Sequence, residues 1–233
     1  MTEEKVDVAG VLVSSEQEAS RLFEAQFAGV GPWSRKEDYT PAEGLQRALE
    51  AAGPWLPVFV RAIAGHLEDD DKALRTLAVV ACERAATVIG PQFIALTLQL
   101  NPELYAGVKP LGHPTNQPDL RWSLLTALGR AVSAEHGDAI RILREAAREK
   151  RGYWLLDALV RVDLPWVIEN AATVVPKDAL GGTLLAMVDT SSRVALVAAM
   201  APWSSAERAE ALASPFWARL PDAAAVRAAL EGA

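Results

Sequence analysis

Hydrophobic residues recur along most of this chain at the three- and four-residue spacing of an amphipathic helix. The clearest stripe is formed by Leu120, Leu124, Leu128 and Ala131, with Leu125 and Ala127 beside it. Alternation typical of a strand is confined to Val6-Asp7-Val8, where a short N-terminal strand and an extended tail both fit. The pattern predicts an all-α protein.

Start and stop signals divide this pattern into short helices. Thr40-Pro41-Ala42-Glu43 combines an N-cap, a proline at the first helical position and an acidic residue at the third. Residues 14–18 and 204–207 contain similar starts, each with serine followed by glutamate. Gly53-Pro54 and Gly90-Pro91 are typical of a helix end followed at once by a new helix.

An internal repeat relates several of these segments. Residues 124–130 (LLTALGR) resemble residues 155–161 (LLDALVR), 31 positions later, and residues 184–188 continue the pattern 29 positions further on. Upstream, Leu74-Arg75 matches Leu120-Arg121 at a spacing of 46, and the longer interval contains the Pro-, Gly-, Asn- and Gln-rich stretch 105–118. A Pro-Trp pair also recurs, at 165–166 and at 202–203. Repeats of this length predict stacked units.

A repeat of two helices predicts an α-solenoid, because a single helix pair leaves an apolar face that only a neighbouring pair can cover. The sequence resembles the HEAT-like repeat proteins, in which the second helix often carries an arginine near its start. The matching positions here are Leu74-Arg75 and Leu120-Arg121. The resemblance covers roughly residues 54–203. It implies a right-handed stack of antiparallel helix pairs. An irregular helical bundle is the alternative, because Gly181-Gly182 interrupts one expected helix.

The predicted organisation is an N-terminal cap or arm over residues 1–40, followed by a single α-helical repeat domain over residues 41–233. The loop at 105–118 is predicted to be inserted into that domain. Terminal units that differ from the internal repeats are typical of caps on a stacked core.

Composition narrows the classes of function. Hydrophobic residues make up 51% and charged residues 23% of the 233 residues, which excludes a disordered chain. The formal net charge of −7 disfavours a protein whose main task is to grip nucleic acid. The single cysteine, Cys82, stands in an apolar run and is expected in the core, since it offers neither an internal disulfide nor a cysteine-rich zinc site. We expect a soluble cytoplasmic protein without membrane contact, because signal-peptide features and a span of about 20 apolar residues are both absent.

Three arginines occupy equivalent places in the repeat, late in three predicted second helices: Arg84, Arg130 and Arg161. Stacked repeats would align them as a ladder whose guanidinium groups suit carboxylates or phosphates. The alternative is local, because a cation in the last turn favours the helix dipole and Asp157 can pair with Arg161 at i,i+4.

A second basic group lies on one predicted helix face and consists of Arg141, Arg144, Arg148 and Arg151. Such a face can bind an acidic partner or a phosphate backbone. A solvated helix face on which Glu145 and Glu149 balance the arginines is the alternative.

Seven tryptophans are present, and four of them follow a proline at a predicted helix start: Trp33, Trp55, Trp166 and Trp203. Trp122 and Trp154 instead lie away from the leucine stripes of their own helices. Each is expected either as an exposed interface hot spot or as a ring covered by a neighbouring repeat.

Motifs for phosphate loops, nucleophile elbows and dinucleotide binding are absent, and the three histidines lack metal-ligand spacing. The sequence therefore favours a non-catalytic module without a cofactor, an adaptor, assembly or immunity-type scaffold that binds an acidic protein. Its predicted partner-binding residues are Arg84, Arg130, Arg161, Trp122, Trp154, Arg144 and Arg148. One alternative, by resemblance to HEAT-like DNA glycosylases for alkylated bases, is a DNA-binding protein or enzyme. Another is a self-associating structural subunit.

Overall fold

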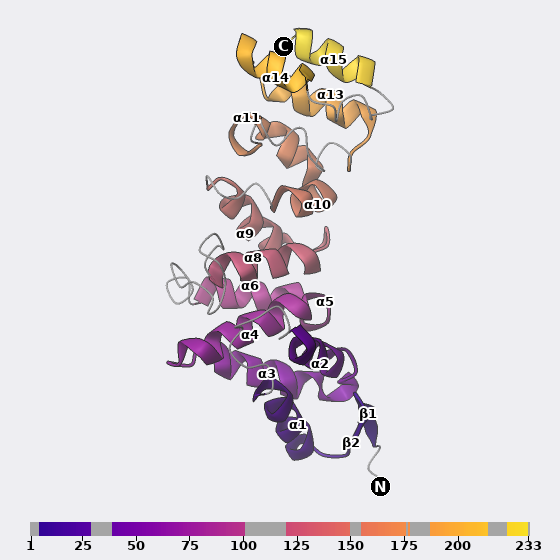
Figure 1. The fold of residues 1–233 in the computed structure, drawn as a ribbon, viewed down its shortest axis with the longest axis vertical. Helices are drawn as coiled ribbons and strands as arrows, with labels where there is room; N and C mark the ends of the chain where they lie inside the picture. Colours follow the sequence, from indigo (N-terminus) through magenta and orange to yellow (C-terminus); the bar gives the residue numbers. More distant parts are fainter. Residues whose placement is uncertain are drawn as a thin grey trace. The chain divides into compact units, whose positions relative to one another are not determined.

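The computed structural model describes residues 5–28, 39–100, 120–149, 155–175, 177, 187–213 and 223–232. Helices dominate these residues, which confirms the predicted all-α class (Figure 1). The chain divides into two compact units, Met1–Ala131 and Val132–Ala233. Within the part of the chain that is described, no helix is long and apolar enough to cross a membrane.

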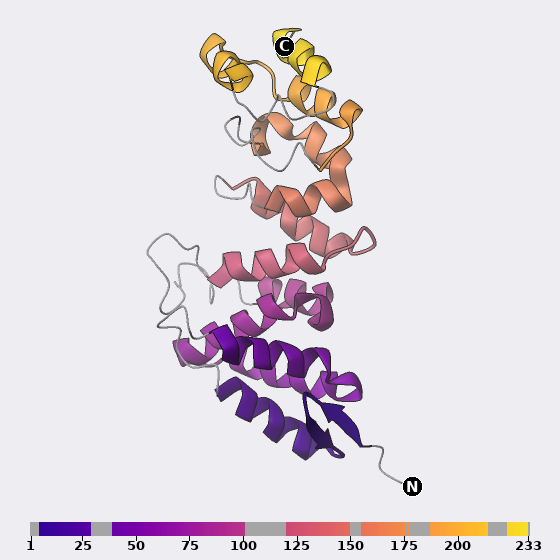
Figure 2. The same cartoon turned by 45° about the vertical axis from the view of Figure 1, so that its right-hand side comes forward.

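The first unit begins with a β-hairpin of strands β1 (Val6–Val8) and β2 (Val11–Val13), which lies beside α1 (Figure 2). Ala9 and Gly10 form its turn with φ values of 52° and 89°, and the Asp7 carboxylate accepts the Gly10 N–H at 2.7 Å. Positive φ at both turn residues matches the twist of paired strands. The N-terminal alternation therefore marks a strand rather than an extended tail.

The helices of the first unit are α1 (Glu16–Ala28), α2 (Tyr39–Glu50), the 3-10 helix η2 (Gly53–Trp55), α3 (Leu56–Leu67), α4 (Lys72–Arg84), α5 (Ala86–Ile89), α6 (Pro91–Leu100) and α8 (Leu120–Ala131). α1 packs against α2 and α3, and both of these pack against α4. α4 in turn packs against α8, which also contacts α5 and α6. The described part of residues 1–40 thus belongs to the same compact unit as the helices that follow it.

The second unit contains α9 (Gly137–Ala147), α10 (Leu156–Glu169), α11 (Ala171–Val174), α13 (Thr190–Ala199), α14 (Ser205–Ala213) and α15 (Ala223–Gly232). α10 packs against α9, α11 and α13, while α15 packs against α13 and α14. α10 is kinked at Asp163, whose φ and ψ are −158° and 48°. Pro165 lies two residues after the kink and cannot donate a backbone hydrogen bond to the preceding turn. The second half of α10 therefore begins near Pro165-Trp166, where the sequence predicted a helix start.

Two predicted helix starts are confirmed by their caps, whereas α2 begins at Tyr39, one residue before the predicted N-cap at Thr40. Ser15 and Glu18 form a capping interaction at the start of α1, and Ser204 and Glu207 form one at the start of α14. Gly90, with φ of 92°, ends α5 immediately before α6. The predicted loop at 105–118 and the interruption at Gly181-Gly182 lie outside the described residues, and the division at residue 40 stays a prediction.

Candidate functional site

The predicted arginine ladder is described in part. Arg130, in the last turn of α8, donates from Nη1 to the Glu83 carbonyl oxygen at 3.3 Å and lies 3.7 Å from the Glu83 carboxylate. Because Glu83 precedes Arg84, the C-terminal ends of α4 and α8 lie next to each other. Arg84 is half-buried, and Arg161 is exposed on α10 in the other unit. Alignment of all three arginines stays a prediction.

Trp122 is buried, with only 6% of its surface exposed. The interpretation as an exposed hot spot is therefore wrong for this residue, and burial by neighbouring helices is confirmed. The physical reason is the position of α8, which α4, α5 and α6 all contact, so that side chains off the leucine stripe are covered as well. The Arg121 guanidinium lies 5.8 Å from the Trp122 ring centroid. Trp154 lies outside the described residues.

The basic face of α9 is arranged around one aromatic ring. The guanidinium carbons of Arg144 and Arg148 lie 5.6 Å and 5.3 Å from the centroid of Trp166. Arg144 also donates from Nε to Asp163 Oδ2 at 2.5 Å. Two arginines spaced i,i+4 thus share one tryptophan, and only one of them is paired with the carboxylate.

The local sequence accounts for this arrangement. The apolar side of α9 is buried through Ala139, Ile140, Ile142, Leu143, Ala146 and Ala147. The arginines therefore leave the helix outside this buried face, and Arg144 and Arg148 reach residues of α10. The kink at Asp163 places a carboxylate and, three residues later, the 8% exposed Trp166 ring beneath them.

Arg141 and Arg148 differ in their charge partners although both are exposed on α9. Arg141 lies 3.1 Å from Glu145 and 3.7 Å from Asp138. Arg148 stacks on Trp166 and has no carboxylate partner among the described residues. None of the described carboxylates occupies its N–H donors, whereas those of Arg141 are already shared.

The second Pro-Trp pair is organised in a related way. Lys177 Nζ lies 5.1 Å from the Trp203 ring centroid, donates to the Pro202 carbonyl at 2.6 Å and pairs with Glu207 at 3.0 Å. Trp203 is buried and donates from its indole nitrogen to the Val197 carbonyl at 3.1 Å. The repeated sequence pair therefore corresponds to a repeated contact of a cation on a tryptophan, which the sequence analysis did not foresee.

Three chemically reactive side chains, Cys82, His66 and His136, are described, and each has contacts of its own. Cys82 is fully buried, as expected, and desolvation raises the pKa of its thiol to about 12. The His66 ring stacks on Phe27, with ring centroids 4.3 Å apart, and contacts the Glu24 carboxylate at 3.2 Å. His136 precedes α9, yet its ring bonds the Ser133 hydroxyl at 2.6 Å. The described residues contain no group of side chains suited to a metal ion.

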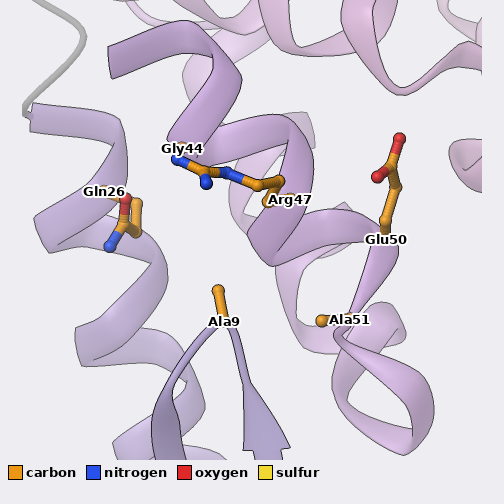
Figure 3. A pocket seen from close by; sticks show the side chains of 6 residues that line it. All are labelled: Ala9, Gln26, Gly44, Arg47, Glu50 and Ala51. Atoms are coloured by element: carbon orange, nitrogen blue, oxygen red, sulfur yellow. The ribbon is translucent and has the colours of Figure 1, made fainter. Parts of the chain in front are cut away.

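A polar cavity in the first unit was missed by the sequence analysis. It has a volume of about 570 Å³ and is lined by Ala9, Gln26, Gly44, Arg47, Glu50 and Ala51 (Figure 3). Its residues come from the hairpin turn, α1 and the α2 region, which lie far apart in the sequence. No motif signals such a site, because it exists only when these three elements are packed.

Comparison with protein-family models, with curated proteins and with solved structures found no match for this chain. The resemblance to HEAT-like repeat proteins thus stays a prediction. The functional argument therefore depends on the geometry of the chain itself.

Proposed function

We propose that this chain is a non-catalytic binding module of stacked helix pairs that recognises an acidic segment of a partner protein. Arg144 and Arg148 on α9 are the central contacts. The observation that carries the proposal is the Arg148 guanidinium, which stacks on Trp166 but has no carboxylate partner among the described residues.

The stacked architecture is supported by the ends of α4 and α8. The repeat pattern aligns these two helices, and the contact of Arg130 with Glu83 brings their C-terminal ends together. Equivalent helices of neighbouring units run in the same direction in a helical repeat protein. A HEAT-like stack of this kind offers extended surfaces for a partner.

Stacking on Trp166 favours binding in two ways. Contact with an aromatic face stabilises a guanidinium and restricts its rotamers before a partner arrives. The side chain therefore loses less conformational entropy when the partner binds. The planar fork of Arg148 then presents paired donors that match both oxygens of a carboxylate. Arg144, held by Asp163, offers the remaining N–H donors of its guanidinium one helical turn away.

The net charge of −7 does not oppose this proposal. The Debye length at physiological ionic strength is about 8 Å, so distant carboxylates contribute little to the field at Arg148. A partner carboxylate in contact with the guanidinium instead experiences the local charge. Nucleic acid is less favoured, because a duplex needs several phosphate contacts along a continuous basic surface.

The test measures binding of a fluorescent glutamate-rich peptide whose two ends are blocked by acetyl and amide groups. We expect Arg148→Gln to weaken binding about tenfold or more, since a hydrogen bond to a charged group contributes about 1.5–3 kcal/mol and 1.4 kcal/mol corresponds to a factor of ten. Fluorescence anisotropy at low and physiological salt gives the dissociation constants.

Arg141→Gln is the matched control, because it removes the same charge from the same helix at a side chain that already has two carboxylate partners. We expect it to change binding less than twofold. Equal losses in both variants would show that only overall charge matters and would refute the Arg148 site. Tighter binding of a DNA duplex than of the peptide would favour the nucleic-acid alternative.

A further inference from the structure

The cavity between the hairpin, α1 and α2 has the dimensions of a small-molecule site. Its volume of about 570 Å³ lies within the range of roughly 300–1,000 Å³ that is typical of such sites. Small residues, Ala9, Gly44 and Ala51, leave the space open, while Gln26, Arg47 and Glu50 supply polar groups (Figure 3). All six residues belong to the first unit, whereas Arg148 belongs to the second.

Arg47 is the anion-binding group of this cavity. Glu50 follows it at i,i+3, a spacing at which opposite charges on a helix commonly pair. Instead the Arg47 side chain extends over Gly44 towards α1, away from the Glu50 carboxylate (Figure 3). Among the described residues, Arg47 has no carboxylate partner. The Arg47 guanidinium is exposed and lines the cavity, and none of the described carboxylates occupies its donors.

Gln26 and Gly44 complete this end of the cavity. A Cβ atom at position 44 would lie 3.2 Å from Gln26 Oε1, so glycine leaves room there for the Gln26 side chain. The Gln26 side chain, which carries an amide N–H donor, also lines the cavity at this end (Figure 3). A guanidinium and an amide N–H together suit the two oxygens of a carboxylate.

Glu50 gives the other end the opposite charge. One of its carboxylate oxygens accepts a hydrogen bond from Gln46 at 2.8 Å, and the second has no hydrogen-bond partner among the described residues. An ammonium group carries three donors and pairs well with such a carboxylate. The described lining residues therefore include one positive and one negative group, which point apart (Figure 3).

We propose that this cavity binds a small zwitterion of the amino acid or short-peptide class. Arg47 and Gln26 hold its carboxylate, and Glu50 holds its ammonium group. A ligand with both charges pairs with Arg47 and with Glu50. A simple anion would pair with Arg47 alone and would be repelled by the Glu50 carboxylate. This site goes beyond the proposed binding of an acidic protein segment and does not depend on it.

The test uses three probes that differ only in their end groups: Ala-Ala, N-acetyl-Ala-Ala and Ala-Ala amide. Titrations are followed in nitrogen–proton correlation spectra through the Gln26 side-chain amide and the backbone amides of Ala9 and Gly44. We expect Ala-Ala to shift these signals with an affinity at least tenfold higher than either blocked form. Inorganic phosphate is the fourth probe and should bind more weakly than Ala-Ala.

Substitutions then assign each end. Arg47→Gln should lower the affinity for Ala-Ala at least tenfold, and Glu50→Gln should reduce the preference for Ala-Ala over its acetylated form to less than twofold. Arg61→Gln is the control, because Arg61 is an exposed arginine of α3 that pairs with Glu16. Absence of shifts at these three residues would overturn the proposal, as would shifts that persist unchanged in Arg47→Gln. Equal binding of phosphate and Ala-Ala would overturn the zwitterion assignment.

Discussion

The two Pro-Trp sites of the second unit both place cations and a carboxylate around a tryptophan ring, but they differ in the number of cations per carboxylate. At Trp203, one cation, Lys177, meets one carboxylate, Glu207, and one backbone carbonyl. At Trp166, two cations, Arg144 and Arg148, lie on the ring, but one carboxylate, Asp163, is within reach.

This difference suggests a structural role for the Trp203 site and a binding role for the Trp166 site. The Lys177 ammonium donates hydrogen bonds to the Pro202 carbonyl and the Glu207 carboxylate, and its charge lies over the Trp203 ring. Two of its three donors and its charge therefore have partners within the protein. At Trp166 the second arginine is ordered by the ring, yet its charge is not neutralised there. The surplus cation is the feature that an acidic partner would use.

The largest expected effect follows from removal of either ring. Both tryptophans are buried, with 8% and 5% of their surfaces exposed, so Trp166→Ala and Trp203→Ala should each lower the free energy of unfolding by about 3–5 kcal/mol. Urea denaturation measures this loss. Only Trp166→Ala should also weaken binding of the blocked glutamate-rich peptide, because only that ring orients Arg148.

Trp166→Phe serves as the control, since it keeps a flat aromatic face beneath the two arginines. We expect it to retain most of the peptide binding at a smaller cost in stability. If both alanine variants lost binding to the same extent under conditions where they are folded, the loss would reflect general destabilisation, and the distinction between the two sites would fail.

A smaller effect distinguishes the two cations. Lys177→Met removes a charged hydrogen bond to a carbonyl, the ion pair with Glu207 and a cation–π contact, so we expect a stability loss of roughly 1–2 kcal/mol. Arg148→Met removes an exposed cation–π contact alone and should cost about 0.5–1 kcal/mol. Denaturant midpoints of the two variants and the wild type give the comparison. A greater loss for Arg148→Met would contradict the structural role assigned to Lys177.

Local signals in the sequence predicted much of the fold. Helix starts at Ser15 and Ser204 were readable because a capping box needs only residues within one turn. The end of α5 at Gly90 was readable for the same reason, since positive φ favours glycine. The Pro-Trp pairs likewise marked a helix start at Trp166 and the approach to α14 at Trp203.

Contacts between elements were not predictable in this way. Trp122 lies off its leucine stripe, and only the number of helices around α8 decides that it is buried. The pairing of Arg144 with Asp163 depends on a kink in a different helix. The cavity around Arg47 depends on three elements that meet only in the folded unit. Side-chain periodicity describes one helix at a time and carries no information on which helix it meets.

The smallest expected effect concerns pH and belongs to the Trp203 site alone. The Ser204 backbone N–H, the Lys177 ammonium and the Ser204 hydroxyl together lower the pKa of Glu207 to about 2. Since the pKa in the unfolded chain is about 4.5, the ionised carboxylate stabilises the fold above that pH, and this stabilisation disappears as pH falls towards 2. Glu207→Gln should therefore be less stable than the wild type at pH 5–7, with the difference in urea midpoint vanishing near pH 2. Glu210→Gln on the same helix is the control, because Glu210 is exposed and has no hydrogen bond or ion pair among the described residues. An equal pH dependence in both variants would show that the general charge of α14, and not the contact between Lys177 and Glu207, sets the acid sensitivity.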